Sequence, residues 1–253
     1  MEEYLLFASI GGLLFLTVLM SSVAEAYEIK QREKRILILK IKNSLDDISH
    51  ILEKLKPYSI PKDVNNLLLN EIIVRLQKIQ LIDRHFHGIQ TLLEEARETY
   101  HSDTAPAETI NLSIKTEQEY KEVMIVLRHL IKLLASSDWL AGVSPEQLNQ
   151  YTAEILLFRC EKIVQFYTDK ANILLNDNRF LPAKENYSYI LSALKSSGII
   201  DNPRVMELTE QAEFMKKNVA EMMSQHTAKM RLGEDAEENK DAMTDKTKKE
   251  TAI

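Results

Sequence analysis

An uncharged apolar stretch near the amino terminus constrains this chain of 253 residues more than any other feature. Residues 4–24 contain no Asp, Glu, Lys or Arg, and most of their side chains are apolar. As a helix, this stretch would be about 31 Å long, which matches the thickness of the hydrocarbon core of a bilayer. It therefore predicts a transmembrane helix that follows a short amino-terminal segment, residues 1–3.

Basic residues are concentrated on one side of the predicted span. Glu2 and Glu3 are the only charged side chains before it, whereas six basic residues follow it closely: Lys30, Arg32, Lys34, Arg35, Lys40 and Lys42. Short segments rich in Lys and Arg stay on the cytoplasmic side of a membrane. The pattern predicts a single-pass protein of a cell membrane, most simply a bacterial inner membrane, with its amino terminus outside and the chain after residue 24 in the cytoplasm.

A cleaved export signal is the alternative interpretation of this amino terminus. Ala24, Glu25 and Ala26 have the small-x-small form that a signal peptidase accepts. However, a signal peptide has a basic segment before an apolar core of about 7–15 residues. Here the preceding segment is acidic and the core is longer, so the sequence favours an uncleaved anchor.

The remainder of the chain has the composition of an all-α protein. The whole chain contains only six Gly and six Pro, and no stretch alternates between apolar and polar residues in the manner of a strand. The pattern predicts an antiparallel helical bundle or helical-repeat domain in the cytoplasm. Its expected parts are a juxtamembrane helix and hairpin over 25–101, a linker over 102–116, a helical domain over 117–231, and a disordered tail over 232–253.

A heptad-like seam follows the span. Its apolar residues are spaced alternately three and four apart, at Ile38, Ile41, Leu45, Ile48, Leu52 and Leu55. This spacing is typical of a helix that packs along a narrow line, as in a coiled coil. Pro57 and Pro61 end the helix, and residues 69–79 repeat the same rhythm, so we expect an antiparallel hairpin. The alternative is that the seam assembles a homodimer or a larger structural homo-oligomer.

Residues capable of catalysis or metal binding are few and poorly placed. His85 and His87 are two apart, and on a helix they would point about 200° away from each other, so we expect a turn there and not a metal site. Cys160 is the single cysteine and is expected to be a buried structural residue. The net charge is −6, and acidic and basic residues are interspersed along the chain without a basic stripe that could bind nucleic acid. We therefore expect no enzymatic activity, no cofactor or metal, and no nucleic-acid partner.

A pattern of small and large apolar residues occupies residues 167–194. Its positions are Ala171, Leu174, Phe180, Ala183 and Tyr187, with Asn176, Asp177 and Asn178 in the turn between them. This stretch resembles one tetratricopeptide repeat, although Lys195 stands where that family usually has a proline and Ile190 replaces a small residue. The resemblance implies two closely packed antiparallel helices and a role in binding peptides or proteins.

The last predicted helix begins at Asn202 and Pro203 and is rich in methionine. Its expected core stripe consists of Leu208, Ala212, Met215, Val219 and Met222. Met206, Met223 and Met230 fall off the centre of that stripe, where flexible and polarizable side chains suit an adaptable contact with a protein partner. The alternative is that all of these methionines belong to the core.

These patterns predict a membrane-anchored cytoplasmic adaptor or scaffold that recruits protein partners to the bilayer. A tethered domain gains effective concentration near other membrane-bound molecules without making any new contact. A structural homo-oligomer built on the 38–55 seam is the main alternative. A cleaved exported protein, or an enzyme that uses Cys160, is less favoured.

Overall fold

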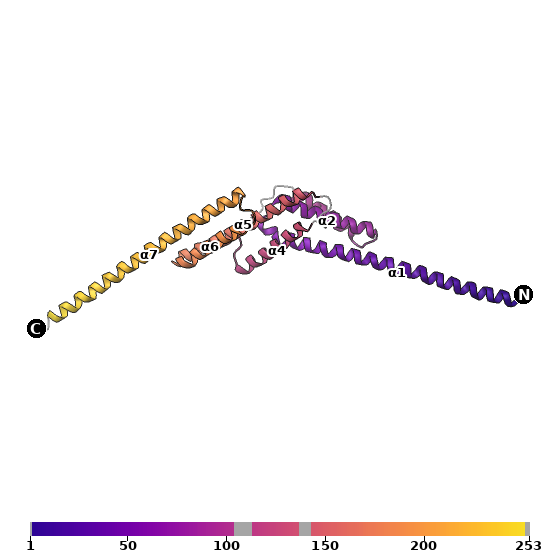
Figure 1. Ribbon diagram of the computed structural model, residues 1–253, viewed down its shortest axis with the longest axis horizontal. Helices are drawn as coiled ribbons and strands as arrows, with labels where there is room; N and C mark the ends of the chain where they lie inside the picture. Colours follow the sequence, from indigo (N-terminus) through magenta and orange to yellow (C-terminus); the bar gives the residue numbers. More distant parts are fainter. Residues whose placement is uncertain (1, 104–112, 137–142, 251–253) are drawn as a thin grey trace. The chain divides into compact units, whose positions relative to one another are not determined.

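A computed structural model describes the backbone of residues 2–103, 113–136 and 143–250 (Figure 1). Side chains are described for residue 15 and for residues 17–102, 113–136 and 143–228. Within this part of the chain every regular element is a helix, so the predicted all-α fold class is confirmed. The chain divides into two compact units, Met1–Lys56 with Lys62–Thr109 and Pro57–Pro61 with Ile110–Ile253.

The first unit consists of three helices, α1 (Glu2–Leu55), α2 (Lys62–Ile82) and α3 (Ile89–Asp103). Helix α2 packs against both α1 and α3, which confirms the predicted hairpin. Leu76, Ile79, Ile89 and Leu93 form a core cluster, against which the seam residues Ile38, Ile41 and Leu45 pack. Further along the seam, Ile48 and Leu55 are buried and Leu52 is half-buried. The part of the seam formed by Ile38, Ile41 and Leu45 therefore packs within a single chain.

Helix α1 runs without interruption from Glu2 to Leu55, since the sequence places no Pro within it and neither Gly nor Pro between residues 25 and 56. It ends at Leu55, where Pro57 disfavours helical geometry at the preceding residue. Among the described residues, none of the helices has the length and apolar character needed to cross a membrane. Most of the predicted span lies outside that set, since the side chains of residues 1–14 and 16 are not described.

The connection between α2 and α3 is the predicted turn. The backbone N–H of His85 donates a hydrogen bond of 3.0 Å to Oδ1 of Asp83. Gly88 has a φ of +77°, a left-handed conformation that side chains with a Cβ seldom adopt. No group of metal-binding side chains occurs in the residues whose positions the structure gives, either here or elsewhere.

The second unit contains α4 (Glu117–Ala135), α5 (Pro145–Asn176), α6 (Phe180–Lys195) and α7 (Pro203–Glu250), in which each helix packs against the next (Figure 1). Capping boxes begin the first two of these helices. Ser144 and Gln147 exchange hydrogen bonds of 3.1 and 3.2 Å around Pro145, which confirms the predicted helix start.

The core of the second unit lies between α5, α6 and α7. The repeat-like residues Ala171, Ala183 and Tyr187 are buried in it, and Leu174 and Phe180 pack against its edge. The two alanines allow α5 and α6 to approach closely, as the resemblance implied. Helix α7 closes the core with Val205, Leu208, Ala212 and Val219. The predicted tail lies outside the residues with described side chains, and its backbone continues α7 as far as Glu250.

Candidate functional site

A cavity of about 440 Å³ opens among α4, α5 and α6 of the second unit. On α5 it is lined by Leu156, Arg159, Cys160 and Ile163. These positions have the spacing i, i+3, i+4 and i+7, which places them on one face of the helix. Residues at the same spacing line it within 121–128 of α4 and within 189–196, which covers the end of α6 and its C-cap Ser196. One face of each of the three helices thus lines the cavity.

The charged groups that line this cavity, among the residues that the structure describes, are Lys121, Arg128 and Arg159. All three are basic, and no described Asp or Glu lines it. Lys121 forms an exposed ion pair with Glu117, with Nζ and Oε1 3.7 Å apart. Within the described residues, neither arginine has an ion-pair or hydrogen-bond partner, and the Nε of Arg159 is buried without one. Among the described residues, the two arginines of this cavity therefore lack a compensating carboxylate, whereas Lys121 has one in Glu117.

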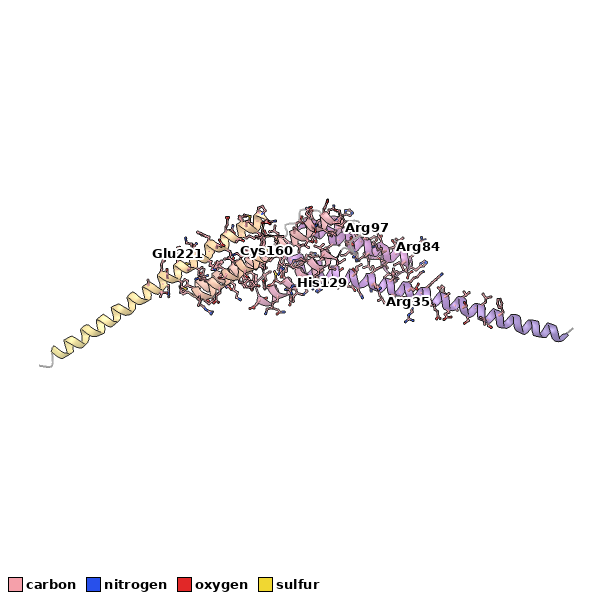
Figure 2. All side chains as sticks on the ribbon, in the orientation of Figure 1. Arg35, Arg84, Arg97, His129, Cys160 and Glu221 are labelled. Atoms are coloured by element: carbon pink, nitrogen blue, oxygen red, sulfur yellow. The ribbon has the colours of Figure 1, made fainter. Side chains whose placement is uncertain are left out.

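Cys160 forms part of the apolar floor of this cavity and is not suited to act as a nucleophile. It is only 3% exposed, within the packed helices of the second unit (Figure 2). Burial raises the pKa of its thiol, and nearby Ser197 and Arg159 offset this effect only in part. The thiol is therefore protonated at neutral pH, which agrees with the structural role expected from the sequence.

An aromatic cluster borders the cavity. Tyr120 stacks on Phe166 with ring centroids 4.4 Å apart, and Tyr167 meets both rings edge-on. Tyr189 lies against Tyr167 at 4.3 Å. Burial is the main cause of the raised pKa values of Tyr120 and Tyr167, the latter to about 12. These phenols remain neutral at physiological pH, so the cluster adds no negative charge.

A second polar site lies at the amino terminus of α4. The carboxylate of Glu119 accepts hydrogen bonds from the hydroxyl of Tyr58 at 2.6 Å and from the backbone N–H groups of Lys115 and Thr116 at 2.9 and 3.3 Å. The bond from Tyr58 is the main reason why the pKa of Glu119 is lowered. Burial, followed by this bond, raises the pKa of Tyr58. The arrangement holds Tyr58 in place and caps a helix.

Lys162 is a buried cation in the same unit. Its Nζ lies 5.3 Å from the ring centroid of Phe158 and 5.8 Å from that of Tyr58, close enough for cation–π attraction. It also donates a hydrogen bond of 3.4 Å to the side chain of Gln165. Burial lowers the pKa of Lys162. Sequence reasoning missed this environment, because Tyr58 is more than a hundred residues away along the chain.

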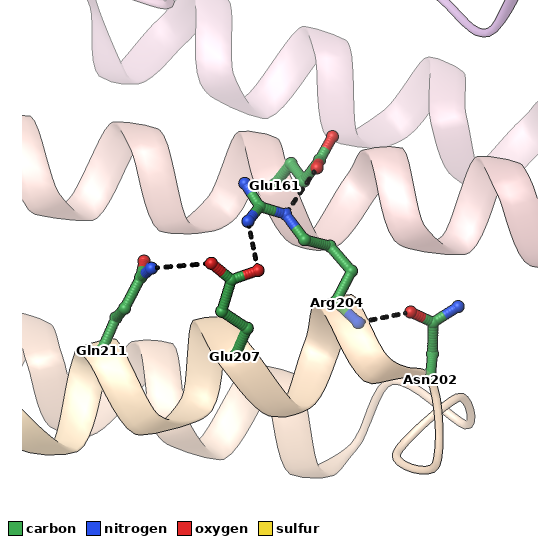
Figure 3. A network of polar contacts seen from close by, with 5 residues as sticks. All are labelled: Glu161, Asn202, Arg204, Glu207 and Gln211. Carbon is green, nitrogen blue, oxygen red and sulfur yellow. Dashed lines mark hydrogen bonds and ion pairs between the residues drawn. The ribbon is translucent and has the colours of Figure 1, made fainter.

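Arg204 links the start of α7 to α5 (Figure 3). Its Nε lies 3.4 Å from Oε1 of Glu161, and its Nη1 lies 2.5 Å from Oε2 of Glu207. Its backbone N–H donates to Oδ1 of Asn202 at 2.9 Å, which is the cap expected from the sequence. All three charged side chains are exposed, so this network contributes little to stability and offers no enclosed site.

The methionines of α7 differ in exposure from the sequence-based expectation. Met206 is 53% exposed, and Met215 packs against the core as expected. Met222, expected in the core stripe, is 39% exposed, whereas Met223 is half-buried. At this end of the helix, Met223 is therefore more buried than Met222, the reverse of the expectation. The side chain of Met230 lies outside the described residues.

Comparison with known proteins assigns no relative. The chain matches no family model, no curated protein and no solved structure. The likeness to a tetratricopeptide repeat therefore rests on residues 167–194 alone, and the functional argument depends on the features of this chain itself.

Proposed function

We propose that this protein is a single-pass membrane-anchored adaptor, which holds a helical binding domain at the cytoplasmic face of a bilayer. The observation that carries this proposal is the uncharged stretch 4–24 within the uninterrupted helix α1. The large apolar side chains described in this stretch are 48% to 69% exposed: Phe15, Val18, Leu19, Met20 and Val23. Protein does not cover them, and a lipid environment would.

The residues that follow the span support the proposed orientation. Tyr27 is exposed at the end of the apolar stretch, where aromatic residues favour the interface between membrane and water. The six basic residues of the segment 30–42 come next, and this excess of Lys and Arg favours the cytoplasmic side.

Two features favour an adaptor over a structural homo-oligomer. Part of the 38–55 seam packs within its own chain, which leaves less apolar surface for a second copy. Helix α7 exposes Met206, Phe214 and Met222 in the second unit, and apolar side chains of this kind can bind a protein partner. The partner-binding residues proposed from the sequence, Met206, Met223 and Met230, lie on the same helix.

The orientation can be tested with a reporter that is active only in the cytoplasm, fused after Ile253. We expect an active reporter in the membrane fraction. Changing Lys30, Arg32, Lys34 and Arg35 to Glu should reduce its activity strongly, since the carboxyl-terminal part would lose its cytoplasmic signal. The matched control changes four distant lysines to Glu: Lys240, Lys246, Lys248 and Lys249. It alters net charge equally and should keep the activity.

Two results would overturn the membrane anchor. One is a mature protein that starts at Tyr27 and is released outside the cytoplasm, which is the outcome of signal-peptide cleavage. The other is an intact chain that remains in the supernatant after membranes have been sedimented.

A further inference from the structure

We propose that the cavity among α4, α5 and α6 binds a small organic anion, with a phosphate or carboxylate head at Arg159 and Arg128 and an apolar body on the cavity floor. This site goes beyond the adaptor role and does not depend on it, because all of its lining residues belong to the second unit.

The charge of the cavity is the first argument. Acidic residues outnumber basic residues in the whole chain, 38 to 32. A second cavity of the same unit, of about 380 Å³, is lined by residues of both charges. These are Lys115 and Lys170 together with Glu117 and Asp169. In the described part of the chain, the lining of the proposed site contains three basic residues and no acidic one. A hollow lined by one sign of charge attracts ligands of the opposite sign.

The state of Arg159 is the second argument. Its Nε is buried and has no hydrogen-bond partner, although buried polar groups in proteins are nearly always satisfied. A guanidinium group offers donors in a planar fork that matches the oxygens of a carboxylate or a phosphate. Rotation of the Arg159 side chain toward the cavity would present this donor to a bound anion, which would supply the partner that it lacks. Arg128, on the facing helix, would share the remaining negative charge.

Serines at the end of α6 add further donors. Ser192 on α6 and Ser196, the residue that caps its carboxyl end, line the cavity from positions four residues apart. Their hydroxyl groups can donate to anion oxygens that the arginines leave free. Ser196 now donates to the carbonyl of Ala193 at 3.1 Å, and rotation of its hydroxyl would redirect that bond.

The floor and size of the cavity indicate the rest of the ligand. Met124, Leu156 and Ile163 line the cavity with apolar side chains, which we take as its floor. A volume of about 440 Å³ falls within the usual range of roughly 300–1,000 Å³ for small-molecule sites. A free inorganic ion would leave this floor uncovered, so the expected ligand combines an anionic head with a compact apolar body.

Binding can be measured by calorimetry on the full-length protein in phosphatidylcholine nanodiscs. The probe is phenyl phosphate, with inorganic phosphate and 2-phenylethanol as matched partial ligands that carry only the head or only the ring. We expect phenyl phosphate to bind at least tenfold more tightly than either. Its affinity should fall as ionic strength rises, because the interaction is electrostatic.

Variants separate a binding role of Arg159 from a structural one. Arg159→Met keeps the length of the side chain and removes its charge and its unpartnered donor. We expect a loss of affinity for phenyl phosphate of tenfold or more, with a melting temperature that is unchanged or higher. Arg128→Met should also weaken binding. The matched control is Arg179→Met, an exposed residue that does not line the cavity, which should leave affinity unchanged.

Several outcomes would overturn the proposal. These are no binding of phenyl phosphate at millimolar concentration, equal binding of 2-phenylethanol, or an Arg159→Met protein that melts lower and binds as well as the unchanged protein. Nanodiscs that contain phosphatidylglycerol identify the source of the anion. A lower apparent affinity there means that a lipid headgroup competes for the site, and an unchanged affinity assigns it to a soluble anion.

Discussion

At the scale of single residues, the least expected feature is a buried ion pair in the first unit. Glu71 and Arg75 lie one turn apart on α2, and both are buried. Arg75 also donates from Nε to the hydroxyl of Ser44 on α1 at 3.1 Å. The apolar rhythm of α2 is therefore interrupted by a polar contact that joins the two helices. Such a contact can fix their register, whereas a purely apolar seam would tolerate sliding.

Tyr58→Phe should cost about 1 kcal/mol at neutral pH, because it removes the hydrogen bond to the Glu119 carboxylate. The folded-state pKa of Glu119 lies below its usual value of 4.5, so this contribution is present above pH 4.5 and is lost as the pH falls through the folded-state pKa. Chemical denaturation over this pH range should show the two proteins converging in stability under acid.

The control for this prediction is Tyr151→Phe, which removes the hydroxyl of a half-buried tyrosine elsewhere in the same unit. It should change stability little at any pH. A difference between Tyr58→Phe and the unchanged protein that persists well below pH 4.5 would show that the charge of Glu119 is not involved.

At the scale of elements, helix ends followed from the sequence because local residues determine them. Ser144, Pro145 and Gln147 begin α5 through contacts within one turn, and Pro57 ends α1 in the same local way. The cavity did not follow, because its three faces belong to helices that the chain brings together only in the fold. The available signal was Arg159, a charged residue among the apolar residues of α5. One position of this kind does not reveal which helices face it.

Replacing both Ile41 and Ile48 with Asp should destabilise the first unit by several kcal/mol. Ile48 is fully buried and Ile41 packs against the core cluster. The double variant would place two carboxylates without partners among apolar side chains, which costs free energy of folding. Thermal unfolding of the full-length protein followed by circular dichroism measures the effect. Leu37→Asp with Leu39→Asp is the matched control, because both residues are exposed on the same helix. Equal melting temperatures for the two variants would mean that the seam makes no stabilising contact.

At the scale of the whole molecule, the proposed adaptor separates attachment from recognition. In this proposal, attachment would use the amino-terminal part of α1 in the first unit, whereas the exposed apolar residues of α7 belong to the second. Changes on α7 should therefore alter partner binding without altering membrane association.

Met206→Gln combined with Phe214→Gln should weaken capture of protein partners from solubilised membranes. These side chains are 53% and 63% exposed, so their loss should barely affect stability, while each contact at a partner interface is worth about 1 kcal/mol or more. Quantitative pull-down with the full-length protein measures the change. Met215→Gln is the control, since its side chain packs in the core and its loss should lower the melting temperature. An unchanged capture pattern in the double variant would place the partner surface outside α7.

The membership of Pro57–Pro61 in the second unit has a consequence for synthesis of the protein. Tyr58 leaves the ribosome about sixty residues before Glu119, its hydrogen-bond partner. The second unit therefore cannot complete its fold from its own later residues alone and must recover a segment made earlier, between two helices of the first unit. A shortened gene that begins in the 102–116 linker would encode α4 to α7 without this segment, leaving Glu119 and Lys162 without the phenol they share.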